Sequence, residues 1–146
     1  METSKLGLSL FSLLVATPML ASAETPDIKP GQWEYQSTMR MSAGGQAMPA
    51  QMVRNKDCVR QEDLTDPDLF GGDELKDCEA SGVEQSRSRL RYTLTCAGPD
   101  GSPYTMTADI KLQGETMEGT MQGDMESPMG PMRMRMELSG KRIGDC

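Results

Sequence analysis

Apolar and polar residues alternate along most of the chain, and this alternation predicts β-strands. From Trp33 to Met41 the odd positions carry Trp, Tyr, Ser and Met while the even ones are polar, which is typical of a strand with one buried face. The alternation is poor over residues 51–58, and it is clear again after Cys78. The pattern predicts seven strands, over residues 33–41, 51–58, 78–84, 89–96, 104–112, 117–125 and 132–138.

The segments between the later strands contain Gly and Pro, as the turns of an antiparallel meander do. A two-residue turn at residues 113–114 would pair Ile110 with Met117, so that the apolar residues of both strands share one face. The expected fold class is therefore mainly β: an antiparallel meander forming a curved sheet or partly open barrel, with one short helix within residues 61–70 and two disulfides.

The first part of the chain has the features of a secretory signal peptide. Lys5 precedes an apolar run over residues 6–15, and an Ala-Ser-Ala cleavage site follows at residues 21–23. The apolar run is too short to span a bilayer, so an uncleaved membrane anchor is the less favoured alternative. We therefore expect a signal peptide over residues 1–23 and a single disulfide-stapled β domain over residues 24–146 that does not span a membrane.

Four cysteines in an exported chain are best interpreted as two disulfides, because the compartments outside the cytosol are oxidising. A hairpin of the third and fourth predicted strands places Cys78 opposite Cys96, although Val83 then faces outward. In an up-and-down strand order Cys58 and Cys146 fall at the same end of the sheet, which makes them the second pair. A redox-active or metal-binding thiol pair is the less favoured alternative, because no C-x-x-C motif is present.

The composition excludes several classes of function. The 146-residue chain contains no histidine, so Ser-His-Asp and Cys-His nucleophile pairs, His-ligated zinc and imidazole proton shuttles are all ruled out. Its net charge of -7 argues against binding to the phosphate backbone of nucleic acids. Methionine is abundant instead, with 14 residues, and it supplements a small number of branched apolar residues.

The candidate ligand-binding residues are methionines of the last two predicted strands. Three convergent thioethers would select Cu(I) or Ag(I) over harder ions, and neighbouring methionines on one face of a single strand are too far apart to form a compact site alone. A second strand must therefore contribute. The candidate metal ligands are Met121, Met125, Met132, Met134 and Met136, with Met39, Met41 and Met106 expected nearby on the same sheet.

Three other interpretations of these methionines stay open. They can replace Leu and Val as adaptable core residues, which is the more common use of methionine. They can form a flexible apolar surface around Met129 that grips varied partners. They can also serve as sacrificial sites of oxidation, which requires only exposure. A metal site requires clustered and partly accessible sulfurs, whereas core residues are dry and dispersed.

Other chemistry-bearing residues have plainer interpretations. The acidic stretch over residues 57–79 does not have the spacing of an EF-hand and is expected to be a solvated loop. Trp33 is expected to anchor the core, with ligand stacking as the alternative. The arginines at positions 87, 89 and 91 line one outward strand face and are expected to be solvated charge rather than a phosphate site.

Spaced landmarks give the mature chain a resemblance to a known family. These are the sequence PGQWE at residues 30–34, the cysteines at positions 58, 78 and 96, Gly119, and the ending GKRIGDC at residues 140–146. With them the chain resembles the bacterial exported proteins grouped as the domain-of-unknown-function 3617 family. The resemblance implies a periplasmic protein of Gram-negative bacteria and implies no activity, because no function is established for that family.

Together these observations lead us to expect a non-enzymatic periplasmic β domain that binds a ligand on its methionine-rich strand face. Cu(I) is the most specific hypothesis for that ligand. The competing hypothesis is a cell-envelope protein-interaction or structural module in which methionine is only core filler.

Overall fold

The computed structural model describes residues 24–65, 77–98 and 100–146, so the expected signal peptide lies outside the described residues. Eight strands form one sheet in which every strand pairing is antiparallel. The strands are β1 (Gly31–Ala43), β2 (Gln46–Ala47), β3 (Gln51–Val59), β4 (Cys78–Gln85), β5 (Arg89–Ala97), β6 (Pro103–Gln113), β7 (Thr116–Ser127) and β8 (Gly130–Gly144). The expected mainly β fold is confirmed.

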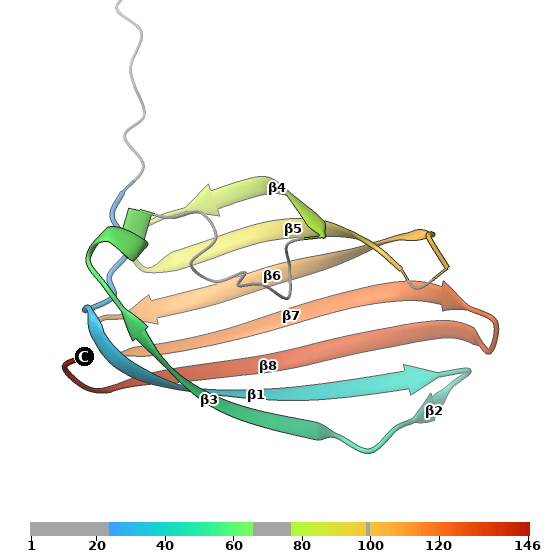
Figure 1. Ribbon diagram of the computed structural model, residues 1–146. Coiled ribbons are helices and arrows are strands. Elements are labelled where there is room, and N and C mark those ends of the chain that lie inside the picture. The colour runs from blue at the N-terminus through green and yellow to red at the C-terminus, as the bar shows by residue number, and fades with distance from the viewer. Residues whose placement is uncertain (1–23, 66–76, 99) are drawn as a thin grey trace, which may run out of the picture.

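The sheet is curved and open (Figure 1). Its strand order is β2-β1-β8-β7-β6-β5-β4, and β3 pairs with β1 on the side away from β8. The first long strand therefore pairs with the last one, as in an up-and-down barrel. Among the described residues, β3 and β4 are the edge strands on the two sides of the sheet, and they do not pair with each other.

Two details of the expected element list differ from the structure. The helix expected within residues 61–70 is a single 3-10 turn, η1 (Glu62–Thr65), and the rest of that range lies outside the described residues. The eighth strand, β2, is a two-residue strand that pairs with the end of β1 and lies between the first two predicted strands. Both differences concern short elements, whose formation depends on neighbours more than on their own sequence.

The predicted register of the β6–β7 hairpin was wrong by two residues. Gln113 pairs with Thr116, so the two-residue turn lies at residues 114–115, and Ile110 pairs with Gly119 rather than with Met117. Gly114 has φ +68°, and a turn with positive φ at its first central position favours Gly there. A shift of two residues leaves every side chain on its predicted face, because side chains alternate with a period of two.

The β4–β5 hairpin contains the first disulfide, Cys78–Cys96, called here the hairpin disulfide. Its two cysteines lie directly opposite each other, as the sequence predicts. Further along, the register shifts by one residue between Ser81 and Glu84, where Gly82 has φ +58°. This β-bulge adds one residue to the edge strand β4, and Val83 is indeed exposed.

The second disulfide, Cys58–Cys146, is called here the terminal disulfide. Strands β3 and β8 flank β1 and are both antiparallel to it, so their last residues lie at the same end of the sheet. The connectivity expected from the up-and-down order is therefore the one present. It closes a loop with a sequence separation of 88, whereas the hairpin disulfide closes one of 18.

The main hydrophobic core lies at the end of the sheet that carries the C-terminus (Figure 1). We call the face that carries it the inner face of the sheet. Trp33 is completely buried and stacks on Tyr35 with their ring centroids 6.1 Å apart. The other buried members of this cluster are Ile28, Val59, Leu64, Leu90, Ile110, Leu112 and Met117. No helix within the described ranges is both long and apolar enough to cross a membrane.

Candidate functional site

Away from that core, the inner face is lined by methionines that lie in rows across the strands. In an antiparallel sheet, directly paired residues point to the same face, with their Cβ atoms about 4.5–5.5 Å apart. Strands β1, β8 and β7 are neighbours; β1 and β8 carry methionine at alternate positions, and β7 carries it at every fourth position. We define the methionine face as the half-buried residues Met39, Met41, Met121, Met125, Met132, Met134 and Met136.

The most complete row consists of three methionines on three adjacent strands. Met136 of β8 pairs with Met39 of β1 on one side and with Met121 of β7 on the other. All three side chains therefore emerge from one face at neighbouring positions. Each methionine side chain is unbranched and flexible, so three thioether sulfurs starting from these positions are able to converge on one point.

The next rows toward the β7–β8 turn are less complete. Met134 pairs with Met41 on β1 and with Gly123 on β7. Met132 pairs with Met125 on β7 and with Ala43 on β1. The five predicted candidate ligands thus share one face of two adjacent strands. They contribute two direct cross-strand pairs, Met121 with Met136 and Met125 with Met132, and one methionine opposite a glycine.

Burial separates the methionines of the chain into distinct groups. Met106 and Met117 are buried in the two hydrophobic clusters. The seven residues of the methionine face are half-buried and adjacent to one another. Met129, at the β7–β8 turn, is 70% exposed. Clustered and partly accessible sulfurs are the arrangement that a soft-metal site requires, and they differ from the dry and dispersed arrangement of core filler.

A tyrosine hydroxyl without a hydrogen-bond partner lies in the same row as Met121. Tyr92 of β5 pairs with Ala108 of β6, which pairs with Met121. The Tyr92 hydroxyl is buried and has no hydrogen-bond partner among the described residues. Burial raises the pKa of this phenol, so the hydroxyl stays neutral. An unsatisfied buried hydroxyl costs stability, so it is an unusual feature at this position.

The outer face of the sheet is covered by ion pairs. Arg89 donates two hydrogen bonds to the Asp109 carboxylate, at 2.7 and 2.5 Å, and these hydrogen bonds lower the pKa of that carboxyl. Arg91 lies 3.6 Å from Asp109 and 3.7 Å from Glu84. Two of the three arginines of the predicted stripe are therefore paired with carboxylates on an exposed surface, and exposed pairs of this kind contribute little to stability.

Acidic residues gather near the β7–β8 turn, at the end of the sheet away from the main hydrophobic core. A hollow near the β7–β8 turn is lined by Asp100, Asp124 and Glu126 together with Tyr104 and Met125. Met125 is also the outermost β7 residue of the methionine face. Asp124 is paired with Arg133 at 3.0 Å, so Asp100 and Glu126 carry the negative charge of this hollow, on a chain with net charge -7. Such charge raises the local concentration of cations.

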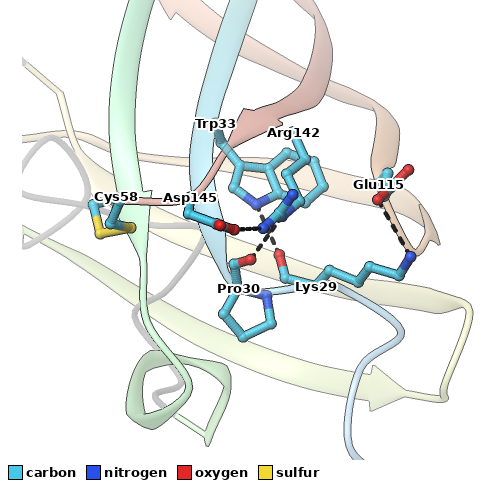
Figure 2. Close-up of polar contacts among 8 residues, drawn as sticks. Lys29, Pro30, Trp33, Cys58, Glu115, Arg142 and Asp145 are labelled. Carbon is cyan, nitrogen blue, oxygen red and sulfur yellow. Dashed lines mark hydrogen bonds and ion pairs between the residues drawn. A yellow bond between two sulfur atoms is a disulfide. The ribbon is translucent and has the colours of Figure 1, made fainter.

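The two ends of the domain are joined at the opposite end of the sheet, beside Trp33 (Figure 2). Arg142 donates a hydrogen bond of 2.7 Å to the Pro30 carbonyl and forms an ion pair with Asp145. The Trp33 indole donates a hydrogen bond of 3.0 Å to the Lys29 carbonyl. We call these contacts and the terminal disulfide the terminal clasp. Because Trp33 is 0% exposed, it anchors the core and has no surface on which a ligand could stack.

The described residues offer few alternatives to thioether ligands. They contain no group of three Cys, Asp or Glu side chains arranged to hold a metal ion, and histidine is absent from the whole chain. All four cysteines are in disulfides. Within the described ranges, the methionine face brings seven thioether side chains together on one surface.

These features define a small protein with an open antiparallel sheet, two disulfides and a methionine-lined inner face. The chain belongs to the family of proteins of unknown function designated DUF3617, whose model matches residues 28–146. No curated protein and no solved structure matches the chain.

Most of the residues that carried the family resemblance have a structural role here. The segments at residues 30–34 and 140–146 contribute Trp33, Arg142 and one cysteine of the terminal disulfide to the terminal clasp. The methionine face lies further along the same strands, beyond these landmarks. The landmarks therefore describe how the domain is held together, and the candidate binding surface is a separate part of the molecule.

Two members of the methionine face were not among the predicted metal ligands. Met39 and Met41 were expected only nearby, yet they pair directly with Met136 and Met134. The signal that could have found them is the matching Met-x-Met spacing at residues 39–41 and 134–136. Using it requires knowing that the first strand pairs with the last one, which the alternation alone does not show.

Proposed function

We propose that this protein is a non-catalytic, periplasmic binding protein that holds a soft metal ion, Cu(I), on its methionine face. The observation that carries the proposal is the row of Met39, Met136 and Met121 on three adjacent strands. Thioether sulfur is a soft, neutral ligand that suits Cu(I) and leaves harder divalent ions without the oxygen or nitrogen donors they prefer.

The geometry of this row supports a site that uses all three sulfurs. The central residue, Met136, has a methionine directly opposite it on each side, so neither neighbour has to reach across an intervening strand. All three side chains are half-buried, which leaves a route for the ion while keeping the sulfurs partly shielded from water. The rigid sheet fixes the three backbone positions, and only side-chain rotamers need to adjust.

Charge supports the approach of a cation. The acidic hollow with Asp100, Asp124 and Glu126 lies next to Met125 at the open end of the methionine face. Asp124 is paired with Arg133 at 3.0 Å, so the attraction of Cu(I) by long-range electrostatics falls to Asp100 and Glu126, while the softer thioethers hold the ion. Export, which the sequence of residues 1–23 predicts, would place the domain in an oxidising compartment where its disulfides persist.

A competitive titration under anaerobic conditions tests the proposal. The mature protein, with both disulfides intact, competes with a chromophoric chelator for Cu(I). We expect a dissociation constant in the micromolar range or tighter, which corresponds to about -8 kcal/mol or better. Replacing Met134 and Met136 together by Leu removes the central thioethers of two neighbouring rows while conserving volume, and it should weaken binding at least about tenfold.

Met52→Leu is the matched control. Met52 pairs with Thr38, whose side chain lies on the outer face, and it is 59% exposed. The Met52→Leu protein should bind Cu(I) with the same affinity as the unsubstituted protein. If the unsubstituted protein fails to compete with the chelator, the methionines are ordinary core and surface residues and do not bind Cu(I). In that case a protein-interaction or structural role in the cell envelope becomes the better account.

A further inference from the structure

A second group of methionines is brought together by a missing side chain. Gly123 of β7 lies between Met134 of β8 and Met106 of β6, and it pairs directly with both. A Cβ atom built at Gly123 would lie only 2.8 Å from Cγ of Met106. The Met106 side chain therefore extends over the glycine, into space that a side chain on β7 would otherwise fill.

The other side of this gap is also occupied by thioethers. Met134 packs against the buried cluster of Leu94, Cys96 and Met106. On its far side Met134 pairs with Met41 of β1. Met41, Met134 and Met106 thus form a second set of three methionines, two residues further along the strands than the row of Met39, Met136 and Met121.

A second glycine, Gly140, also leaves space that a methionine side chain fills, but there the methionine packs against an aromatic ring. At Gly140 of β8, a Cβ atom would lie 2.6 Å from Cγ and 3.1 Å from Sδ of Met117, and 3.0 Å from the ring of Tyr35. There the methionine fills the gap against an aromatic ring and is only 2% exposed. At Gly123 the methionine is buried as well, since Met106 is 7% exposed, but its neighbour across the glycine is the half-buried thioether of Met134 rather than an aromatic ring.

We propose that the methionine face holds two soft-metal sites, and that Met106 completes the second one across Gly123 together with Met134 and Met41. The inference rests on the proposed function and extends it from one ion to two ions per chain. A displacement of two residues along a strand corresponds to about 6.4–6.8 Å, so the two ions would be close neighbours with separate ligands.

Counting bound ions in the intact protein tests this inference. Ag(I) is the probe, because it is a soft ion that does not change oxidation state in air, and native mass spectrometry counts the ions per chain. We expect the unsubstituted protein to bind two Ag(I). Met106→Leu should bind one, whereas Met117→Leu, the matched substitution at the other glycine gap, should still bind two.

Met41→Leu provides an independent check if the buried substitution disturbs folding. Met41 is half-buried on β1, and its loss should also reduce the count from two to one. A count of one in the unsubstituted protein that Met106→Leu leaves unchanged would overturn the second site and leave the proposed function standing. A folded Met106→Leu protein that binds no ion would show a single shared cluster and would also overturn it. No binding by the unsubstituted protein would overturn both proposals.

Discussion

The close contacts at Gly123 predict that Gly123→Ala destabilises the fold. A Cβ atom at this position would lie 2.5 Å from the backbone carbonyl oxygen of Thr105, in addition to its contact with Met106. The carbonyl belongs to the neighbouring strand β6, so it cannot move aside without displacing the sheet. Gly119 on the same strand is less crowded, because its nearest neighbour would be the Ile110 side chain at 3.0 Å.

Two opposing effects determine the size of the change. Gly123 has no positive φ, so alanine can adopt its backbone conformation, and the lower entropy of the unfolded chain would stabilise the protein by about 0.4–1 kcal/mol. Overpacking in a well-packed site costs about 1–3 kcal/mol. Since a backbone atom must move, we take the upper part of that range and expect a net loss of about 1–2 kcal/mol. For Gly119→Ala the two effects should nearly cancel.

Thermal unfolding followed by circular dichroism, with both disulfides intact, measures the difference. For a domain of this size, 1 kcal/mol corresponds to roughly 4 °C in Tm. Gly123→Ala should therefore melt about 4–8 °C below the unsubstituted protein, with Gly119→Ala close to it. A Gly123→Ala protein as stable as the unsubstituted one would refute the steric reasoning. It would also remove the argument that Met106 needs the space above this glycine.

Three further predictions concern the disulfides and the tyrosines. In the chain-entropy model, replacing both cysteines of the terminal disulfide by Ser lowers the free energy of unfolding by about 4.6 kcal/mol. The same replacement at the hairpin disulfide lowers it by about 3.2 kcal/mol, and urea denaturation should reproduce this order. Tyr92→Phe should raise the free energy of unfolding by about 1 kcal/mol, because it removes an unsatisfied hydroxyl; a loss would show that the hydroxyl has a partner. Burial, with a smaller effect of Asp57, raises the pKa of Tyr35 to about 12. Stability should therefore fall as pH rises above about 10, and Tyr35→Phe should reduce that fall in alkaline denaturation curves.

Much of the fold follows from the sequence, because the alternation of side chains is itself a consequence of strand geometry. The strands over residues 89–96 and 104–112 were predicted nearly to their ends, and both disulfides connect the expected cysteines. The register of the β6–β7 hairpin could not be obtained from the apolar pattern, since a shift of two residues keeps the same face buried. The position of Gly114 in the turn decides it.

The candidate site was less accessible to prediction than the fold. The alternation correctly placed Met121 and Met136 on the same face, but the contribution of β1 depends on long-range pairing with β8. The role of Gly123 depends on its two neighbouring strands as well as its own, because the Met106 side chain of β6 occupies the space beside this glycine. Such features arise from packing between distant segments and have no local sequence signal.

The central claim is that thioether sulfurs of the methionine face bind Cu(I). X-ray absorption spectroscopy at the copper edge, on a protein of residues 24–146 loaded anaerobically with one equivalent of Cu(I), tests it most directly. We predict Cu(I) with a first coordination shell of sulfur alone, a shell that is lost or depleted when Met134 and Met136 are both replaced by Leu and retained in Met52→Leu. A first shell of oxygen or nitrogen atoms, or a sulfur shell unchanged when Met134 and Met136 are both replaced by Leu, would contradict it.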